Sequence, residues 1–394
     1  MKYRFADRMD GLFGSAVRNP LFEDPELISL APGKPEGSVF PAEELIPIAT
    51  DVLLKYREVA LQYSDTEGLY ELRDLIAKQR MAAAGVDCTA EDITLTSGSQ
   101  EAIEMAAKIF INEGDTIIVE DPSYVGVYNA WKPYNPKYVG IPMDEDGMRM
   151  DALEEVLKTT PNAKMIYTIP DFQNPTGIVM SDDRRKKLAE LAAEYQIPVI
   201  EDGPYSDLYY YGERHPSIKS FDKDGWVVNF GSFSKIFCPG FRLAWVCADP
   251  VILEKFQLCK QGSNLQCSTF DEMLALEYMK KHDINEHIEH VRAMYKERRD
   301  TMVECIEKYF PADVKHTSPM GGFFLWLELP EGIDTGEMLT EACLKYKVGY
   351  VQGEGFFCEP GRKNFIRLSY SYASPEKIEE GMKRLGNLLT KYYK

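Results

Sequence analysis

Short apolar runs alternate with amphipathic segments between about residues 68 and 250, and this alternation constrains the fold more than any other feature of the sequence. The short runs suit buried strands, while the amphipathic segments repeat apolar residues at the spacing of a helix. Strands that alternate with helices predict a mostly parallel sheet covered by helices on both faces, so we predict an α/β fold. The predicted strands lie within 92–99, 115–122, 137–142, 163–170, 197–205, 226–234 and 243–250, and the predicted helices within 68–85, 100–110 and 182–196.

The sequence changes character after about residue 285, where one long helix is predicted over 284–309. Strand-like runs at GGFFLWLELP, VGYVQG and FIRLSYS and a closing helix follow it, which indicates a second, smaller α+β domain. Residues 1–45 are rich in proline and glycine, and we interpret them as an N-terminal arm that also forms part of the small domain. We therefore predict a large domain over 46–285 and a C-terminal small domain over 286–394.

Composition and charge exclude several classes of protein. The net charge of -18 opposes binding to nucleic acid or to an anionic membrane, and we expect neither partner. No apolar run reaches the roughly 18 residues that a membrane-spanning helix needs, and the charged N-terminus is unlike a signal peptide. The cysteines occur singly, without the paired spacing of zinc or redox motifs, so we expect reduced cysteines, a cytoplasmic protein and no metal site.

The candidate functional residues follow the predicted strands, because ligands of an α/β sheet bind at the carboxyl ends of its strands. Five such segments should converge on one edge of the sheet. They are SGSQ (97–100), EDPSY (120–124), PDFQNPTG (170–177), EDGPY (201–205) and GSFSK (231–235).

The first and last of these segments offer a site for an anion. SGSQ leads into a predicted helix whose free N–H groups favour a phosphate, and Ser99 and Gln100 add side-chain donors. Ser232, Ser234 and Arg242 add two hydroxyls and a guanidinium, which binds phosphate well. Taken alone, SGSQ is more simply explained as a helix N-cap.

The other segments offer an acid, a lysine and polar side chains. Asp202 ends an apolar strand, where a carboxylate is costly unless paired, so it is either a helix cap or the partner of a protonated ring nitrogen. Lys235, at a strand end among apolar and cationic residues, can have a lowered pKa and form a Schiff base. Tyr124 and Tyr205 could contact a ligand or simply pack, and Asn174 before a proline could be a turn residue.

One cofactor uses all of these groups together. Pyridoxal 5′-phosphate needs a phosphate site, an acid at its pyridine nitrogen, donors to its ring hydroxyl and a lysine for its aldehyde. The segment GSFSKIFCPGFR would place both Lys235 and Arg242 on one ligand, with the Pro239–Gly240 turn between them. We therefore predict pyridoxal phosphate as the cofactor.

These motifs give the chain a family resemblance over essentially its full length. SGSQ, NPTG, EDGPY, SFSK with PGFR, and the late FIRLSY resemble the class I/II aminotransferases of pyridoxal-phosphate fold type I. QYSDTEGLYELR and GKPEGSVFP resemble the subgroup of 2-aminoadipate and kynurenine aminotransferases, which also contains the aminotransferase-like half of certain bacterial regulators. The resemblance implies that the large domain binds the cofactor on a mostly parallel sheet, beside a smaller α+β domain.

The resemblance also implies a role for each motif residue. Lys235 would hold the cofactor and shuttle the proton, Asp202 would keep the pyridine nitrogen protonated and Tyr124 would stack on the ring. Arg367 would bind the substrate α-carboxylate, and Arg18, in an arm over the site, would select the distal end of the substrate. The remaining implied contacts are Gly98, Ser99, Gln100, Ser232, Ser234 and Arg242 for the phosphate, Asn174 and Tyr205 for the ring oxygen, and Gly33 and Asn174 for the substrate.

The implied activity is amino-group transfer from an L-amino acid to a 2-oxo acid, of 2-aminoadipate, aromatic, glutamate or aspartate type. Arg242 lies seven positions after Lys235, one fewer than in aspartate aminotransferases proper, which weakens the aspartate assignment. Tyr63 would reach the phosphate of a neighbouring subunit, so we expect a homodimer. The alternatives are a carbon–sulfur lyase on the same fold and a non-catalytic regulatory protein, the latter disfavoured by the acidic charge and by the early start of the catalytic-type region.

Overall fold

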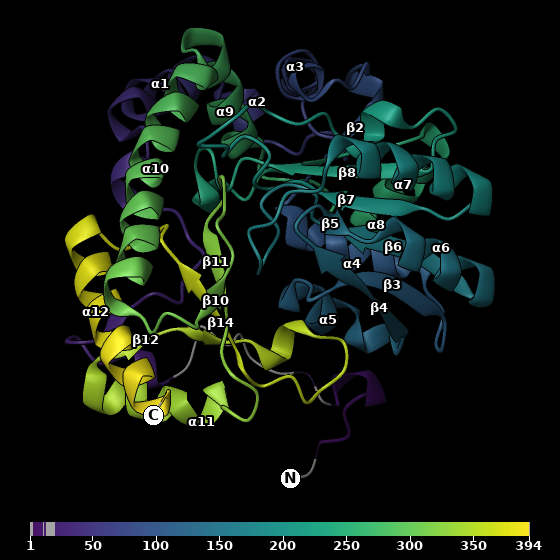
Figure 1. The fold of residues 1–394 in the computed structure, drawn as a ribbon. Coiled ribbons are helices and arrows are strands. Elements are labelled where there is room, and N and C mark those ends of the chain that lie inside the picture. Colours follow the sequence, from purple (N-terminus) through teal and green to yellow (C-terminus); the bar gives the residue numbers. More distant parts are fainter. Residues whose placement is uncertain (1–2, 11, 13–19, 394) are drawn as a thin grey trace.

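The computed structural model describes residues 3–10, 12 and 20–393 of the chain. Its largest feature is an eight-stranded sheet (Figure 1). In sequence order the strands are β2 (Ile93–Thr96), β3 (Thr116–Asp121), β4 (Lys137–Asp144), β5 (Gly147–Met148), β6 (Ala163–Thr168), β7 (Val199–Asp202), β8 (Val227–Ser232) and β9 (Ala244–Cys247).

The strands of this sheet are mostly parallel. Their spatial order is β2-β9-β8-β7-β6-β3-β4-β5, and the neighbours from β8 to β4 all pair in parallel. Strand β9 runs antiparallel to both β8 and β2, and the edge strand β5 runs antiparallel to β4. The predicted α/β fold is therefore confirmed, although the sequence pattern did not indicate the short strand β5.

Helices cover both faces of the large sheet, and neighbouring residues of one strand belong to different cores. Ile117 and Val119 of β3 pack in one apolar cluster, whereas Ile118 between them packs in another. This alternation follows from the pleat of a strand, which sends successive side chains to opposite faces. The covering helices are α4 (Ser99–Phe110), α5 (Val125–Trp131), α6 (Met150–Thr159), α7 (Asp182–Tyr195) and α8 (Pro250–Gln261).

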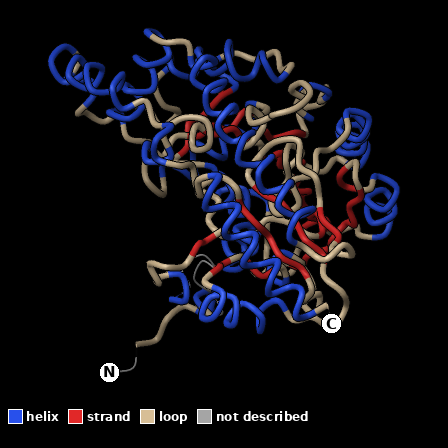
Figure 2. The backbone as a smooth tube through the Cα atoms, turned by 60° about the vertical axis from the view of Figure 1, so that its left-hand side comes forward, coloured by secondary structure: helices blue, strands red, loops and turns tan. Residues whose placement is uncertain are grey.

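A smaller, antiparallel sheet lies beside the large one, and helices surround its strands (Figure 2). The long helix predicted over 284–309 is confirmed as α10, and the closing helix as α12. The predicted domain boundary falls at the start of α10 and stays a prediction. The elements are β10 (Lys315–His316), β11 (Phe324–Glu328), β13 (Val351–Gln352) and β14 (Phe365–Ser369), in the order β10-β11-β14-β13, with α10 (Ile284–Tyr309), α11 (Thr335–Glu341) and α12 (Pro375–Tyr392).

The single strand predicted at VGYVQG is wrong, because the chain changes sheets there. Strand β12 (Val348–Gly349) pairs with β1 (Ile28–Ser29), while β13 pairs with β14. Between them Tyr350 is fully buried and donates its hydroxyl to the Thr335 carbonyl at 2.8 Å. This buried anchor separates two short strands that the sequence presents as one.

The N-terminal segment reaches the small sheet and then forms helices beside the large one. Pairing of β1 with β12 continues in the Leu30 N–H bond to the Gly349 carbonyl, and the Leu30 carbonyl accepts from Ser369 N–H. The predicted helix 68–85 ends at Gly85 as expected, with the left-handed φ of 76° that suits glycine, after a π-helical turn. The helices here are α1 (Ala42–Lys55), α2 (Arg57–Ala60), α3 (Tyr70–Ile76) and α9 (Thr269–Lys281).

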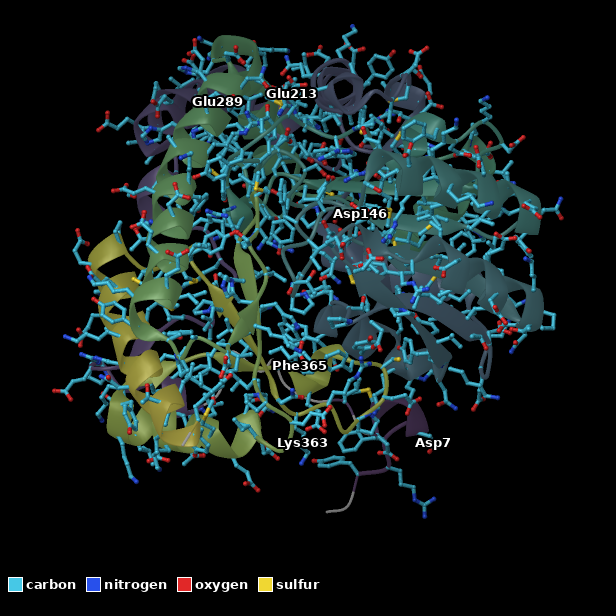
Figure 3. All side chains as sticks on the ribbon, in the orientation of Figure 1. Asp7, Asp146, Glu213, Glu289, Lys363 and Phe365 are labelled. Atoms are coloured by element: carbon cyan, nitrogen blue, oxygen red, sulfur yellow. The ribbon has the colours of Figure 1, made fainter. Side chains whose placement is uncertain are left out.

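An apolar cluster joins the small sheet to the large one. Trp326, Val351 and Phe356 form this cluster, with Val125 of α5 packed against it. Phe365 of β14, which is labelled in Figure 3, stacks on Trp326 with ring centroids 5.5 Å apart. No helix within residues 3–10, 12 and 20–393 is long and apolar enough to cross a membrane.

Candidate active site

A cavity of about 550 Å³ opens at the carboxyl ends of the large sheet's strands, on the side of the small sheet. Its volume lies in the range of sites that hold small ligands and cofactors. All five loops predicted from the sequence contribute to its wall. The predicted residues that line it are Gly33, Ser99, Gln100, Tyr124, Asn174, Asp202, Tyr205, Ser232, Ser234, Lys235, Arg242 and Arg367.

The wall also contains residues that sequence reasoning did not select. Phe324, Val351 and Phe356 come from the small-sheet side, and Val125 begins α5. Lys34, exposed beside Gly33, adds a cation. An apolar residue in a strand or loop gives no local signal that separates a cavity wall from a core, so no pattern could have identified the first four.

Lys235 presents its amine to the cavity from the loop after β8. Its Nζ donates to the Gly33 carbonyl at 2.9 Å, which ties the loop to the N-terminal segment. Burial, together with the nearby Arg367 and Arg242 guanidinium groups, lowers the pKa of Lys235 to about 8, against an opposing effect of Asp202. A lysine of this kind is partly neutral near physiological pH and can act as a nucleophile or a base.

Asp202 ends β7 with one carboxylate oxygen that has no protein partner. Its Oδ2 accepts the Tyr167 hydroxyl at 2.7 Å, while Oδ1 is buried without a hydrogen bond from any described residue. Burial raises the pKa of Asp202 to about 6, although Tyr167 and Lys235 both act to lower it. A buried, unpaired carboxylate oxygen in a cavity wall fits a ligand that carries an N–H cation.

Arg367 brings a buried positive charge to the same cavity from β14. Its Nη1 donates to Asn174 Oδ1 at 3.0 Å and its Nη2 to the Ala31 carbonyl at 3.0 Å. The guanidinium lies 4.2 Å from the Phe324 ring centroid and 5.1 Å from that of Phe356, and its Nε has no described partner. Burial lowers the pKa of Arg367 to about 10, so the group is still a cation at neutral pH and suits a carboxylate.

Two glycines let these groups approach. A Cβ on Gly33 would lie 2.5 Å from Cζ of Phe324, so only glycine permits the N-terminal segment to pass this ring. Gly98 has φ +93°, and a Cβ there would lie 2.1 Å from Nη2 of Arg242. Gly98 therefore does not line the cavity itself but makes room for Arg242, whose Nη2 donates to the Ser97 carbonyl at 3.2 Å.

The start of α4 and the loop after β8 form the end of the cavity that is rich in hydroxyls. Ser99 opens α4, and its buried Oγ lacks a hydrogen-bond partner in the described part of the chain. Ser232 Oγ accepts the N–H of Ser234 at 3.0 Å, which shapes the loop before Lys235. Free helix N–H groups, hydroxyls and Arg242 together suit a phosphate.

Two tyrosines complete the cavity wall. The Tyr124 hydroxyl donates to Gln100 Oε1 at 3.3 Å, which connects the loop after β3 to α4. Tyr205 packs against Phe323 and Phe324, with ring centroids 5.6 and 5.9 Å away. Burial raises the pKa of Tyr205, so its hydroxyl keeps its proton and can donate a hydrogen bond.

Gly98 and Tyr63 are predicted site residues that do not line this cavity. Tyr63 follows α2 and is 78% exposed, outside the cavity of its own chain. Arg18 lies outside the described residues. Residues 3–10, 12 and 20–393 contain no group of three histidine, cysteine or acidic side chains that could hold a metal ion.

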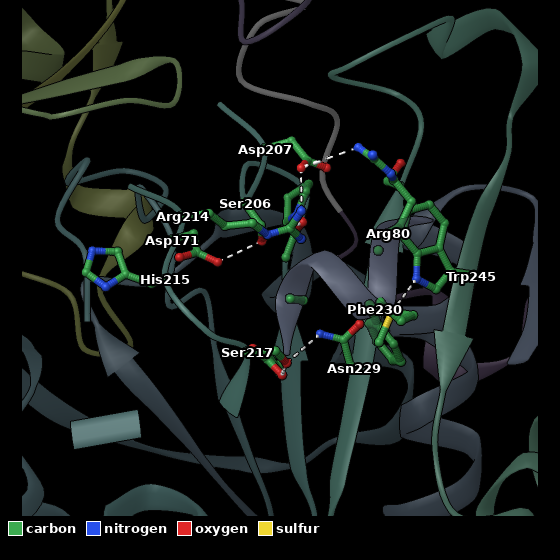
Figure 4. Close-up of a pocket in the computed structure, with 17 residues that line it drawn as sticks. Arg80, Asp171, Ser206, Asp207, Arg214, His215, Ser217, Asn229, Phe230 and Trp245 are labelled. Carbon is green, nitrogen blue, oxygen red and sulfur yellow. Dashed lines mark hydrogen bonds and ion pairs between the residues drawn. The ribbon is translucent and has the colours of Figure 1, made fainter. Parts of the chain in front are cut away.

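A second, much smaller cavity of about 20 Å³ shares Pro204 and Ser232 with the wall of the first (Figure 4). It contacts the loop after β7, and Asp207 there lies between the guanidinium groups of Arg80 and Arg214. A space of this size holds about one water molecule. Lys235 and Arg367 are not part of its wall.

Comparison with known proteins agrees with this site. Residues 26–385 match the family model described as aminotransferase class I and II. The chain is 42% identical over 391 residues to aromatic-amino-acid aminotransferase 1 of Thermococcus litoralis, covering 98% of this chain and 94% of that protein. It is 37% identical over 372 residues to 2-aminoadipate transaminase of Thermus thermophilus, covering 94% of this chain and 91% of that protein.

A solved structure shows the same likeness in three dimensions. Kynurenine aminotransferase of Pyrococcus horikoshii, solved with PMP and with kynurenine as substrate, superimposes with a TM-score of 0.95. The two chains are 40% identical, and the match covers 99% of this chain and 98% of that one.

Proposed function

Since this chain belongs to the class I and II aminotransferases, we propose that the cavity around Lys235 is its active site. The protein is an enzyme that moves an amino group from an amino acid to a 2-oxo acid with pyridoxal phosphate as cofactor, on the fold of type I. When bound, the cofactor supplies an electrophilic aldehyde carbon and a ring that takes up the electron pair released at the substrate Cα.

The groups left without protein partners fit this cofactor. The unpaired Asp202 Oδ1 matches a protonated ring nitrogen, and the unpaired Ser99 Oγ matches a phosphate oxygen. Both atoms belong to residues of one cavity, together with the amine of Lys235. The Asp202 oxygen is the single observation that carries the assignment, because a buried carboxylate oxygen without a protein partner is costly unless a cationic group of a ligand pairs with it.

The residues around the cofactor ring would each have a different role. Lys235 Nζ would carry the cofactor and, once free, would accept the proton from the substrate Cα, which a pKa of about 8 permits. Asp202 would keep the ring nitrogen protonated, and Tyr124 would stack on the ring. Asn174 Oδ1 already accepts from Arg367, so its Nδ2 would donate to the ring oxygen beside Tyr205.

The phosphate end has its own set of donors. The α4 N-terminus supplies free N–H groups, and the guanidinium of Arg242 supplies the charge. Gly98 supports this arrangement by leaving space for Arg242. The side-chain donors would be Ser99, Gln100, Ser232 and Ser234.

The substrate end combines a cation with an apolar wall. Arg367 would bind the α-carboxylate, with Asn174 and the backbone at Gly33 beside it. Val351 and Phe356 would then contact the substrate side chain. An apolar wall of this kind supports aromatic amino acids as donors, and three relatives named for aromatic, 2-aminoadipate and kynurenine substrates are consistent with donors of this size.

Acidic donors form a second candidate class. The exposed ammonium of Lys34 lies at the cavity, 4.0 Å from the Tyr372 ring centroid, and a side-chain carboxylate of glutamate or 2-aminoadipate would pair with it. The role predicted for Arg18 at the distal end of the substrate also stays a prediction, because this residue lies outside the described part of the chain.

We further propose a cytoplasmic homodimer in which Tyr63 reaches the partner's phosphate site. Leu54 on α1 is 73% exposed, and Leu61 and Tyr63, which follow α2, are 70% and 78% exposed. Such exposure is unusual for large apolar side chains that lie close together. A second copy would cover them. The cysteines are all free, which supports a reducing compartment.

A half-reaction screen tests the proposed activity. The purified holoenzyme is mixed separately with phenylalanine, kynurenine, 2-aminoadipate, glutamate, aspartate and alanine, and the loss of its visible absorbance is followed. We expect phenylalanine and kynurenine to convert the enzyme fastest and to yield the matching 2-oxo acids. Cystathionine is added to the screen as a substrate with a carbon–sulfur bond, and release of a thiol, ammonia and a 2-oxo acid from it would indicate a lyase instead. Conversion by no amino acid would contradict the proposal.

A further inference from the structure

Glu120 lies one residue before the end of β3 and is buried directly beneath two loops of the site. It is 1% exposed, and its carboxylate accepts three hydrogen bonds. Thr168 Oγ1 donates at 2.5 Å, the N–H of Ile169 at 3.2 Å and Gln173 Nε2 at 3.1 Å. All three donors lie at or just after the end of β6, so one side chain of β3 fixes the start of the loop that follows β6.

Gln173 spans the gap between the loop that carries Tyr124 and the loop that carries Asn174. Its Nε2 donates to the Pro122 carbonyl at 2.8 Å as well as to Glu120. Its Oε1 accepts Thr176 N–H at 2.9 Å and the Thr176 hydroxyl at 2.8 Å. Every polar atom of this buried amide is therefore used, and the amide fixes the distance between the two loops.

We propose that Glu120 is a positioning residue of the active site, which acts through Gln173 to hold Tyr124 and Asn174 in register with each other. The inference rests on the proposed roles of Tyr124 and Asn174. Glu120 touches neither the cavity nor the reacting atoms, because it points to the same face of β3 as Ile118, away from the face of Val119. A shift of its loops would nevertheless change hydrogen-bond geometry at the cofactor, where errors near 1 Å cost on the order of a hundredfold in rate.

The chemistry of Glu120 dictates which substitutions are informative. Burial raises the pKa of Glu120 to about 7, even though Thr168, Ile169 and Gln173 all act to lower it, and the charge of Asp202 raises it further. The carboxyl is therefore only partly ionised near neutral pH, and we expect the oxygen that receives Ile169 N–H and Gln173 Nε2 to matter more than the charge. Glutamine supplies that oxygen and an amide group for Thr168 Oγ1, whereas methionine supplies neither.

Glu201 provides a matched control on the neighbouring strand. It lies one residue before the end of β7, is 2% exposed and also accepts three hydrogen bonds. Its donors are Ser217 Oγ at 2.6 Å, Ile218 N–H at 2.8 Å and Lys219 N–H at 3.1 Å, in a segment that does not line the large cavity. Glu201→Met therefore removes the same number of buried hydrogen bonds without freeing a loop that carries Tyr124 or Asn174.

The experiment compares holoenzymes of Glu120→Met, Glu120→Gln, Glu201→Met and Asn174→Ala. Thermal unfolding is measured for each, together with kcat/KM and the pH at which the visible absorbance of the bound cofactor changes. Asn174→Ala should raise that pH, because a donor to the ionised ring oxygen is lost. Glu120→Met should also raise the pH of the absorbance change, and it should lower kcat/KM by about tenfold or more. In Glu120→Gln both the pH of the change and kcat/KM should return to near the wild-type values.

The four variants distinguish a failure of this inference from a failure of the proposed function. Glu201→Met should lose about as much thermal stability as Glu120→Met while its absorbance transition stays at the wild-type pH. If the absorbance of both methionine variants changes at the wild-type pH while that of Asn174→Ala changes at a shifted pH, Glu120 is merely structural and the inference is wrong. An unshifted Asn174→Ala would refute the proposed role of Asn174 and the inference with it. Should Glu120→Met fail to fold, Gln173→Leu removes the bridge but keeps the bonds from Thr168 and Ile169, and the same comparison applies.

Discussion

Lys235 shows how burial prepares a single residue for chemistry. The ammonium form loses hydration in the cavity wall and faces two guanidinium groups, so the pKa falls to about 8 from the ordinary value of 10.5. Asp202 opposes this effect but lies opposite a space that the ring nitrogen would fill. The same burial raises the pKa of Asp202 to about 6, which leaves it ionised at neutral pH. An amine that is partly neutral and a carboxylate that is charged can thus coexist in one cavity.

The pH dependence of covalent cofactor attachment tests this lowered pKa. Only the neutral amine of Lys235 attacks the aldehyde, so the attachment rate of the cofactor-free protein should rise with pH and level off above about pH 8. Rapid mixing with pyridoxal phosphate between about pH 6 and 10, followed by absorbance, measures this profile. A rate that still rises tenfold per pH unit at pH 9 would show an ordinary lysine. In the control Lys235→Ala, borohydride should fix no cofactor to the protein.

At the scale of elements, the loop after β7 is held in place by buried charges. Asp207 follows Asp202 and Tyr205 on this loop and is 8% exposed. Arg80, from the π-helical turn after α3, lies 3.5 Å from its Oδ1, and Arg214 contacts the same oxygen (Figure 4). Helix α10 adds Arg292, whose Nε donates to the Asp207 carbonyl at 2.6 Å. Asp207 thus holds its own loop through Arg214 and connects it to two other parts of the fold, the turn after α3 and helix α10.

Substitution of Asp207 should therefore destabilise the protein strongly. Asp207→Asn leaves Arg80 buried without its counter-charge, so we expect the free energy of unfolding to fall by about 3 kcal/mol or more. The control is Asp74→Asn, which breaks an exposed pair with Lys78 and should cost less than about 1 kcal/mol. Denaturant midpoints of the holoenzymes at one fixed cofactor concentration measure the difference. Equal midpoints for the two variants would contradict this account of the loop.

At the scale of the whole molecule, the acidic surface is interrupted by exposed apolar side chains on and after the first two helices. Ile46 and Leu54 of α1 are 68% and 73% exposed, and Leu61 and Tyr63 just after α2 are 70% and 78% exposed. Water contact with so much apolar surface is unfavourable, so a partner surface would stabilise it. The proposed homodimer accounts for this exposure and for the absence of Tyr63 from the cavity of its own chain.

Introduction of negative charge at this surface should separate the subunits. The double substitution Leu54→Glu and Leu61→Glu would bury two carboxylates at the proposed interface, so we expect monomers in sedimentation experiments and a large loss of activity. Leu344→Glu is the control, because Leu344 is also exposed, at 59%, but lies after α11. It should keep both the dimer and the activity. A wild-type protein that sediments as a fully active monomer would refute the proposed dimer.

The sequence by itself determined the parts of this protein that depend on local periodicity and turn chemistry. Apolar spacing identified seven strands of the large sheet, and the rule for strand ends then selected the loops of Asp202 and Lys235 before any contact was known. Gly85 was identified as a helix end because only local backbone geometry matters there.

Only the tertiary structure decided which distant segments meet. Arg367 reaches Asn174 and Ala31 because β14, the loop after β6 and the N-terminal segment pack around one cavity. The split of VGYVQG between two sheets and the bridge from Glu120 to Gln173 have no local signature either. The physical reason is that sequence periodicity records which face of a helix or strand is buried, but not which residues that face is buried against. Those contacting residues are determined by long-range packing and become known only when the sheets are assembled.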